Sequence, residues 1–175
     1  MPLLPYARTG TTVQITFVRH PDAPDRIYVV RDDGTEVSWS FPSYGEGLPH
    51  DLVHLLLERR FGLRQGFWGR VADGVDVARI NAAANREGGK GKYAGFGDDL
   101  RELYLAEALA GAPWSLAELD DAALLQMLHA QVSSTGAPAP ALSVALVTEI
   151  RAELEAVRQR WRAQAPKGAL RFEFP

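Results

Sequence analysis

The stretch LPHDLVHLLLERRFGLRQGFWGR, residues 48–70, joins an apolar run to two histidines and a Gly-Phe-Trp-Gly segment. Pro49 suits the first helical position, because a residue there needs no amide hydrogen, and Gly62 suits a left-handed C-terminal cap. The spacing therefore predicts a helix that begins at Pro49 and ends near Phe61. Leucines cover most of its circumference, which indicates that the helix is buried on several sides.

A narrow polar stripe interrupts the apolar surface of this predicted helix. It consists of His50, His54, Glu58 and, at its edge, Asp51. Two histidines four residues apart project from one helix face, where they can share a metal ion. The stripe predicts a site for zinc or another divalent metal, with His50, His54 and Glu58 as ligands. Asp51 is then the candidate catalytic group that orients a water molecule, although its carboxylate is one methylene shorter than that of the His-Glu-x-x-His motif.

The same stripe admits a second interpretation. Both histidines can be packing residues that hydrogen-bond to neighbouring backbone or carboxylate groups, without any metal. Within the metal interpretation, Glu58 lies eight residues from His50, so that it reaches the same ion with difficulty. A carboxylate from another helix, such as Glu102 or Glu107, is the easier third ligand.

Two segments of this stretch and one near the C-terminus carry a resemblance. The segment Pro-His-Asp-Leu-Val-His at 49–54, the Gly-Phe-Trp-Gly at 66–69 and the Arg-Trp-Arg-Ala at 160–163 resemble a pattern in uncharacterised bacterial proteins of similar length. The resemblance covers a minor part of the chain. It implies no activity and therefore transfers no mechanism.

Period-two alternation of apolar and polar residues predicts four β-strands outside this stretch. They are residues 12–19, 26–31, 36–41 and 169–174. The Asp-Gly at 33–34 predicts a hairpin between the second and third strands. The expected fold class is α+β, with an N-terminal antiparallel meander of three strands, which the fourth can join, packed against a helical remainder. We expect residues 1–175 to form a single globular domain.

The helical remainder is predicted from apolar residues at helical spacing. We expect helical pieces at about residues 66–73, 75–84, 98–110, 115–132 and 141–163. Ser115 and Glu118 have the spacing of a capping box for the fourth of these helices, with Trp114 and Leu119 placed as a hydrophobic staple. Phe67 and Trp68 are interpreted as core anchors, because large aromatic residues dominate cores.

A glycine-rich segment at 88–97 contains Lys90 and Lys92 between its glycines. The two lysines are candidate ligand-binding residues, because a loop that carries them could close over an anion. The competing interpretation is a linker, since a segment with so many glycines is entropically costly to order.

The charge and the amino-acid composition of the chain reduce the number of functions that are expected for it. The net charge of −3 over 175 residues argues against general nucleic-acid binding. The chain has no cysteine, which is typical of a cytoplasmic protein, and we expect no signal peptide and no membrane segment. Two functions stay open: a metal-dependent hydrolase, and a non-enzymatic binding or regulatory module in which the histidines are structural.

Overall fold

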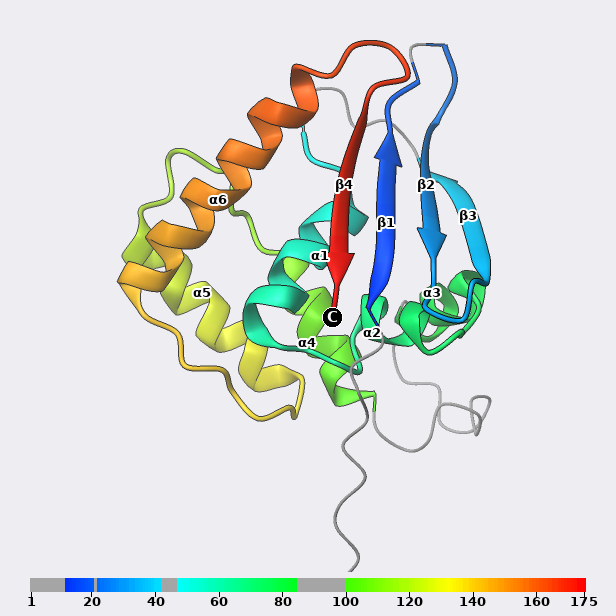
Figure 1. Cartoon of the computed structure of the whole chain (residues 1–175). Helices are drawn as coiled ribbons and strands as arrows, with labels where there is room; N and C mark the ends of the chain where they lie inside the picture. Colours follow the sequence, from blue (N-terminus) through cyan, green and yellow to red (C-terminus); the bar gives the residue numbers. More distant parts are fainter. Residues whose placement is uncertain (1–11, 21, 42–46, 85–99) are drawn as a thin grey trace, which may run out of the picture.

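The computed structural model describes residues 12–20, 22–41, 47–84 and 100–175, which form four strands and six helices (Figure 1). The strands are β1 (Val13–Val18), β2 (Asp25–Val30), β3 (Glu36–Phe41) and β4 (Ala169–Phe174). The helices are α1 (His50–Phe61), α2 (Phe67–Ala72), α3 (Val77–Ala84), α4 (Arg101–Ala110), α5 (Asp121–Ser134) and α6 (Val144–Arg162).

The four strands form one antiparallel sheet in the order β3-β2-β1-β4. The predicted α+β class and the N-terminal meander are therefore confirmed, and the fourth strand does join the sheet. It lies beside β1, with Leu170 opposite Phe17. Gly34, at a φ of 80°, closes the predicted hairpin between β2 and β3. This positive φ is the reason that the turn takes a glycine.

One face of the sheet is buried and the other is largely exposed. Along β2 the side chains alternate strictly between buried and exposed, as the period-two pattern of a half-buried strand requires. The buried face meets the helices through aromatic rings: Phe17 contacts Trp68 of α2, and Phe41 contacts Trp161 of α6. In Figure 1 helices α1, α2 and α4 lie behind the sheet, and α6 runs beside β4.

Helix α1 packs against α4 and α2. Its residues Leu52, Leu55, Leu56 and Leu57 are all buried, as the apolar circumference predicts, and its longest packing contact is with α4. The predicted cap is also found, because Gly62 ends the helix at a φ of 65°. Phe67 and Trp68 are buried in the core, as their interpretation as anchors requires.

The predicted capping box at Ser115 is wrong. Helix α5 begins at Asp121, and its N-terminal cap is Asp120, whose side chain accepts a hydrogen bond from the Ala123 amide. Residues 111–120 instead form a loop of turns between α4 and α5. The guanidinium of Arg151 on α6 donates to the backbone carbonyls of Trp114 and Leu116, so tertiary hydrogen bonds hold this loop in a non-helical conformation.

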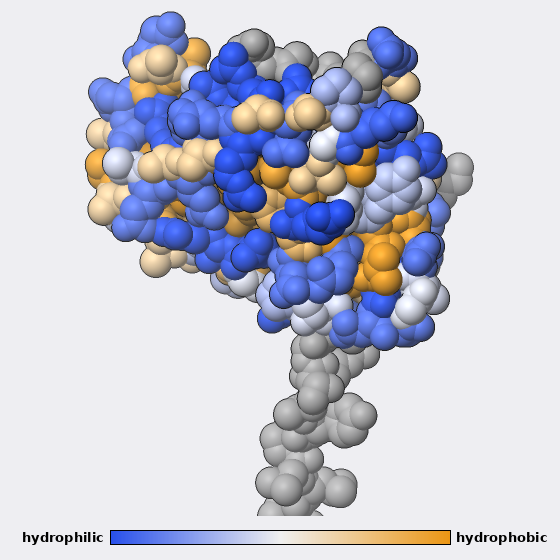
Figure 2. Space-filling view, turned by 45° about the horizontal axis from the view of Figure 1, so that its top comes forward, coloured by the Kyte–Doolittle hydropathy of each residue, from blue (hydrophilic) through white to orange (hydrophobic). Residues whose placement is uncertain are grey.

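In the view of Figure 2 hydrophilic residues predominate, and hydrophobic residues show through in separate patches. In the part of the chain that the structure describes, no helix has the length and apolarity that crossing a membrane requires.

The position of β4 generates a stability prediction. Leu170 is buried against the helices, whereas its neighbour Arg171 is exposed on the other face of the sheet. We expect Leu170→Ala to destabilise the protein by about 2–5 kcal/mol, which lowers the melting temperature by roughly 2–4 °C per kcal/mol. Arg171→Ala is the matched control and should stay within about 0.5 kcal/mol of the parent. Equal melting temperatures for the two variants in a thermal scan would contradict the packing of β4.

Candidate metal centre

Three potential metal-ligating side chains come together between α1 and α4. His50 and His54 lie one turn apart on α1, and Glu107 faces them from α4. The Glu107 Oε2 lies 3.6 Å from the His50 Nε2 and 3.3 Å from the His54 Nε2. One ligand atom from each residue lies within 4.8 Å of the other two. Tetrahedral zinc with bonds of roughly 2.0–2.1 Å places its ligand atoms about 3.3 Å apart. The two distances from Glu107 to the histidines, 3.6 and 3.3 Å, are close to this value.

The centre is closed on one side and open on the other. The His54 side chain is 2% exposed, whereas the side chains of His50 and Glu107 are 46% and 31% exposed. His54 therefore anchors the group in the interior. His50 and Glu107 form the side that solvent or a ligand can reach.

Glu58 lies behind His54, on the side away from Glu107. Its side chain is fully buried, and its Oε1 lies 3.0 Å from the His54 Nδ1. The backbone amides of Phe67 and Trp68 donate to the same carboxylate, each at 2.9 Å. With Nδ1–H donating to Glu58, the other ring nitrogen of His54 is directed at Glu107. A carboxylate that holds one nitrogen of a histidine and leaves the other for a metal is the usual support of a metal-ligating histidine.

The Gly-Phe-Trp-Gly segment explains how Glu58 can be buried. Phe67 and Trp68 are the first two residues of α2, whose amides have no partner within the helix. A Cβ at Gly66 would lie 2.6 Å from the carboxyl carbon of Glu58, so only glycine lets the carboxylate approach these amides. A Cβ at Gly69 would lie 1.9 Å from the Arg64 carbonyl oxygen. Both glycines of the segment are thus required by close contacts.

Glu102 and Asp51 are held away from the two histidines. The Glu102 carboxylate accepts hydrogen bonds from the backbone amides of Arg64 and Gln65 in the α1–α2 connection. The Asp51 carboxylate accepts a hydrogen bond of 2.9 Å from the Trp39 indole on β3. The Asp51 backbone carbonyl accepts one of 2.8 Å from the Trp68 indole. In this arrangement both residues fix the position of α1.

Burial and charge act against each other at His54. Burial disfavours the imidazolium, but hydrogen bonds to Glu107 and Glu58 outweigh it and raise the pKa of His54 to about 9. Burial also opposes ionisation of Glu107, and its bonds with His50 and His54 overcome this and lower its pKa to about 2. For Glu58, burial raises the pKa, and the hydrogen bonds from His54, Trp68 and Phe67 oppose it. A positive charge at His54, carried by a proton or supplied by a bound cation, therefore suits the two carboxylates.

The structure thus brings together some of the predicted site residues and not others. His50 and His54 face one another as the four-residue spacing predicts, with ring centroids 4.7 Å apart. Glu107, which the sequence named only as an alternative third ligand, joins them. Glu58 contacts the opposite nitrogen of His54, and Asp51 belongs to no group of potential metal ligands among the described residues. Lys90 and Lys92 lie outside the described residues.

Comparisons of this chain with protein-family models, with curated proteins and with solved structures find no significant match. The resemblance of the His-Asp-Leu-Val-His and Gly-Phe-Trp-Gly segments to uncharacterised bacterial proteins therefore stays a prediction. The fold and the centre define the molecule as an α+β protein with a cluster of two histidines and one glutamate between two helices.

The contact between Gly66 and Glu58 can be tested by a double-mutant cycle. We expect Gly66→Ala to destabilise the protein by about 1–3 kcal/mol, because the added methyl group displaces the buried carboxylate. In a Glu58→Ala background the clash is gone, so the additional cost of Gly66→Ala should fall below about 0.5 kcal/mol. Urea denaturation of the four proteins measures the coupling. Additive costs in the double variant would show that the two residues are independent.

The shifted pKa of His54 predicts how the stability of the metal-free protein depends on pH. The unfolded chain releases this proton near pH 6.5 and the folded protein near pH 9. The stabilisation is complete below pH 6.5 and is lost as the pH rises through 9, by up to about 3 kcal/mol. Glu107 predicts the opposite dependence at acidic pH, because its contribution to stability is lost as the pH falls from 4.5 toward 2.

Urea denaturation in the presence of a chelator, between pH 6 and 9.5, measures how the free energy of unfolding falls as the pH rises. His54→Gln should remove this decline in stability. His129→Gln, at an exposed position, is the control and should retain the decline. A decline that persists unchanged in His54→Gln would assign the titration to another group.

Proposed function

We propose that this protein binds one divalent metal ion through His50, His54 and Glu107 and uses it as a metal-dependent hydrolase. The observation that carries the proposal is the orientation of His54. Its Nδ1 is held by the buried Glu58 carboxylate, and its Nε2 lies 3.3 Å from Glu107, within the group of three ligand atoms. Buried carboxylates that accept from the distal nitrogen of a histidine are a recurrent support of metal sites.

The composition of the centre favours a catalytic metal over a structural one. Structural zinc sites have four protein ligands, whereas catalytic sites have three and keep a position open for water or substrate. The described residues supply three ligands here, and two of them, His50 and Glu107, are partly exposed. The open position would lie on this exposed side.

Two imidazoles and one carboxylate suit zinc best, as in zinc hydrolases with a His₂Glu ligand set. Iron(II) and manganese(II) accept the same donors and are the next candidates. When bound, zinc lowers the pKa of its water to about 7, which supplies a nucleophile at neutral pH. In this proposal Glu58 fixes the tautomer of His54, and Glu107 is the third ligand. Asp51 stays the weaker candidate for orienting water, since its carboxylate would have to leave Trp39.

The second candidate function is a non-enzymatic binding or regulatory module. A specific observation favours it: a protonated His54 can donate to Glu58 and Glu107 at once, at 3.0 and 3.3 Å. In that case His54, Glu58 and Glu107 form an ion network, buried at His54 and Glu58, that joins α1 to α4. His50, at 46% exposure, would then have little part in stability and none in metal binding.

Metal analysis of protein purified without a histidine tag separates the two functions. After incubation with zinc and dialysis, we expect about one equivalent per chain. His50→Ala and Glu107→Gln should each weaken zinc binding at least tenfold while the fold is retained, because both side chains are partly exposed. His129→Ala, an exposed histidine outside the centre, is the matched control.

The hydrolase proposal is rejected by the opposite result. Less than about a tenth of an equivalent of zinc, manganese, iron or nickel, with none taken up on dialysis, leaves the ion network as the function of these residues. Zinc binding that is unchanged in both His50→Ala and Glu107→Gln would place the metal elsewhere.

A further inference from the structure

A pocket of about 680 Å³ adjoins the candidate metal centre. His50 belongs to both, because it is one of the three potential ligands and also lines the pocket. The other walls come from the segment before α1, from α1 itself, from the end of α4, from the α4–α5 loop and from α6. The pocket and the exposed side of the centre therefore share the His50 side chain.

The wall of this pocket is mainly apolar. Its apolar side chains include Val53, Ala110, Ala112, Trp114, Leu116 and Leu154. Leu116 is 48% exposed, so part of this apolar wall is accessible to a ligand. Volumes of roughly 300–1,000 Å³ with predominantly hydrophobic walls are typical of sites for small organic ligands.

Tertiary contacts hold the loop that forms one side of the pocket. The Arg151 guanidinium donates to the Trp114 carbonyl at 3.0 Å, to the Leu116 carbonyl at 2.8 Å and to the Asp121 carboxylate at 2.8 Å. The Trp114 indole donates to the Leu109 carbonyl at 2.7 Å. A wall fixed in this way does not have to be ordered by a ligand, so less binding energy is lost on association.

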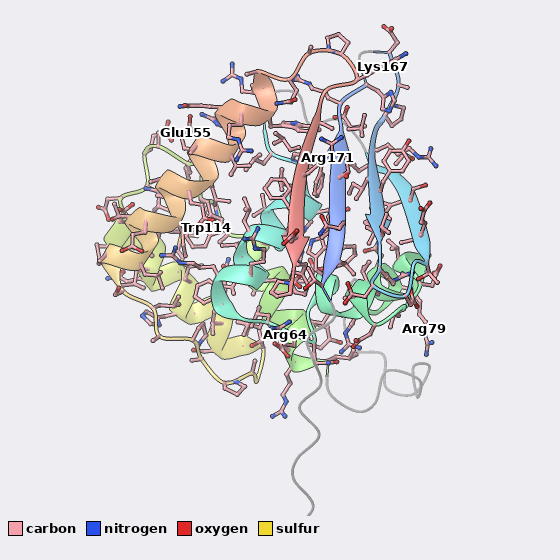
Figure 3. All side chains as sticks on the ribbon, in the orientation of Figure 1. Arg64, Arg79, Trp114, Glu155, Lys167 and Arg171 are labelled. Atoms are coloured by element: carbon pink, nitrogen blue, oxygen red, sulfur yellow. The ribbon has the colours of Figure 1, made fainter. Side chains whose placement is uncertain are left out.

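The charged residues of the pocket are neutralised by partners within the protein. Arg151 is paired with Asp121, and Arg158 is paired with Glu155 at 2.7 Å. Figure 3 shows Glu155 on α6 and Trp114 on the same side of the molecule. Since neither guanidinium requires an anion from a ligand, the walls select an uncharged, apolar group.

We propose that this pocket binds the apolar acyl or aryl arm of an ester or amide whose carbonyl group lies at the centre of His50, His54 and Glu107. The proposal rests on the proposed metal-dependent hydrolysis. In the reaction, a water-derived hydroxide adds to the carbonyl carbon, and the bond from that carbon to the alcohol oxygen or amine nitrogen then breaks. The leaving group takes up the proton lost by the water, so that the products are a carboxylic acid and an alcohol or amine. The acid retains the apolar arm in the pocket.

Alkyl hydroxamates test this assignment, because their head group chelates zinc while their chain can be lengthened. We expect the affinity of the zinc-loaded protein to rise at least tenfold from acetohydroxamate to octanohydroxamate, measured by isothermal titration calorimetry. Full burial would contribute up to about fourfold for each methylene. If acetohydroxamate binds and chain length has no effect, the pocket assignment is overturned while the metal centre stands. If the protein takes up no zinc, both proposals fail.

Variants of the pocket test where the alkyl chain of the hydroxamate binds. Ala117 is exposed and lines the pocket, so Ala117→Trp should fill it and remove the gain for octanohydroxamate, with acetohydroxamate unchanged. Ala130→Trp on the exposed side of α5 is the matched control and should retain the gain. Leu116→Ser, also at an exposed position, provides a second variant that makes the wall polar without adding bulk. An undiminished gain in both pocket variants would overturn the assignment.

Discussion

Burial of the Glu58 carboxylate is the constraint on which the centre of this structure depends. A carboxylate removed from water is very unfavourable unless hydrogen bonds and a positive partner replace its hydration. Here the amides of Phe67 and Trp68 and the ring of His54 supply these bonds. The two amides are available only because α2 begins at this point, and they are reachable only because residue 66 is glycine. The buried carboxylate thus ties the end of α1 to the start of α2.

The same carboxylate determines what His54 can do. Because Nδ1 is hydrogen-bonded to Glu58, Nε2 is the ring nitrogen that can bind a proton or a metal ion. It faces Glu107 across the contact between α1 and α4. Between two carboxylates this position favours a cation. A proton on His54 suits this position in the metal-free protein, because the hydrogen bonds to Glu58 and Glu107 raise the pKa of His54. A divalent ion would satisfy it in the proposed holoprotein, with His50 added as a ligand. Proton and metal therefore compete for the same nitrogen.

Helix α1 combines a core element with the surface that carries the candidate metal ligands. Its leucines are buried on several sides, and its polar stripe passes from the fully buried Glu58 to the half-exposed His50. The stripe is thus rigid at one end and accessible at the other. Precise positioning of a reactive group requires such support from behind, and exchange of ligands requires the open end. The pocket beside His50 lies at the accessible end.

Local patterns in the sequence determined the elements of this protein. Alternation of apolar residues defined the strands, the leucine-rich circumference defined α1 as a buried helix, and Gly62 defined its end. The spacing of four residues placed His50 and His54 on one face. These features depend on neighbours within one or two turns, and local backbone geometry is sufficient to predict them.

Only the tertiary structure decided the third member of the centre and the start of α5. Glu107 is 53 positions beyond His54 and was one of two carboxylates that the sequence could not rank, since the packing of α4 on α1 decides which of them faces the histidines. Glu58 was predicted as a metal ligand because it shares the stripe of the two histidines, but the amides at the start of α2 hold its carboxylate on the other side of His54. Ser115 has the local signature of a helix start, yet Arg151 on α6 engages the carbonyls around it. In each case the partner that decides the outcome lies outside the local stretch of sequence, so a local pattern cannot predict it.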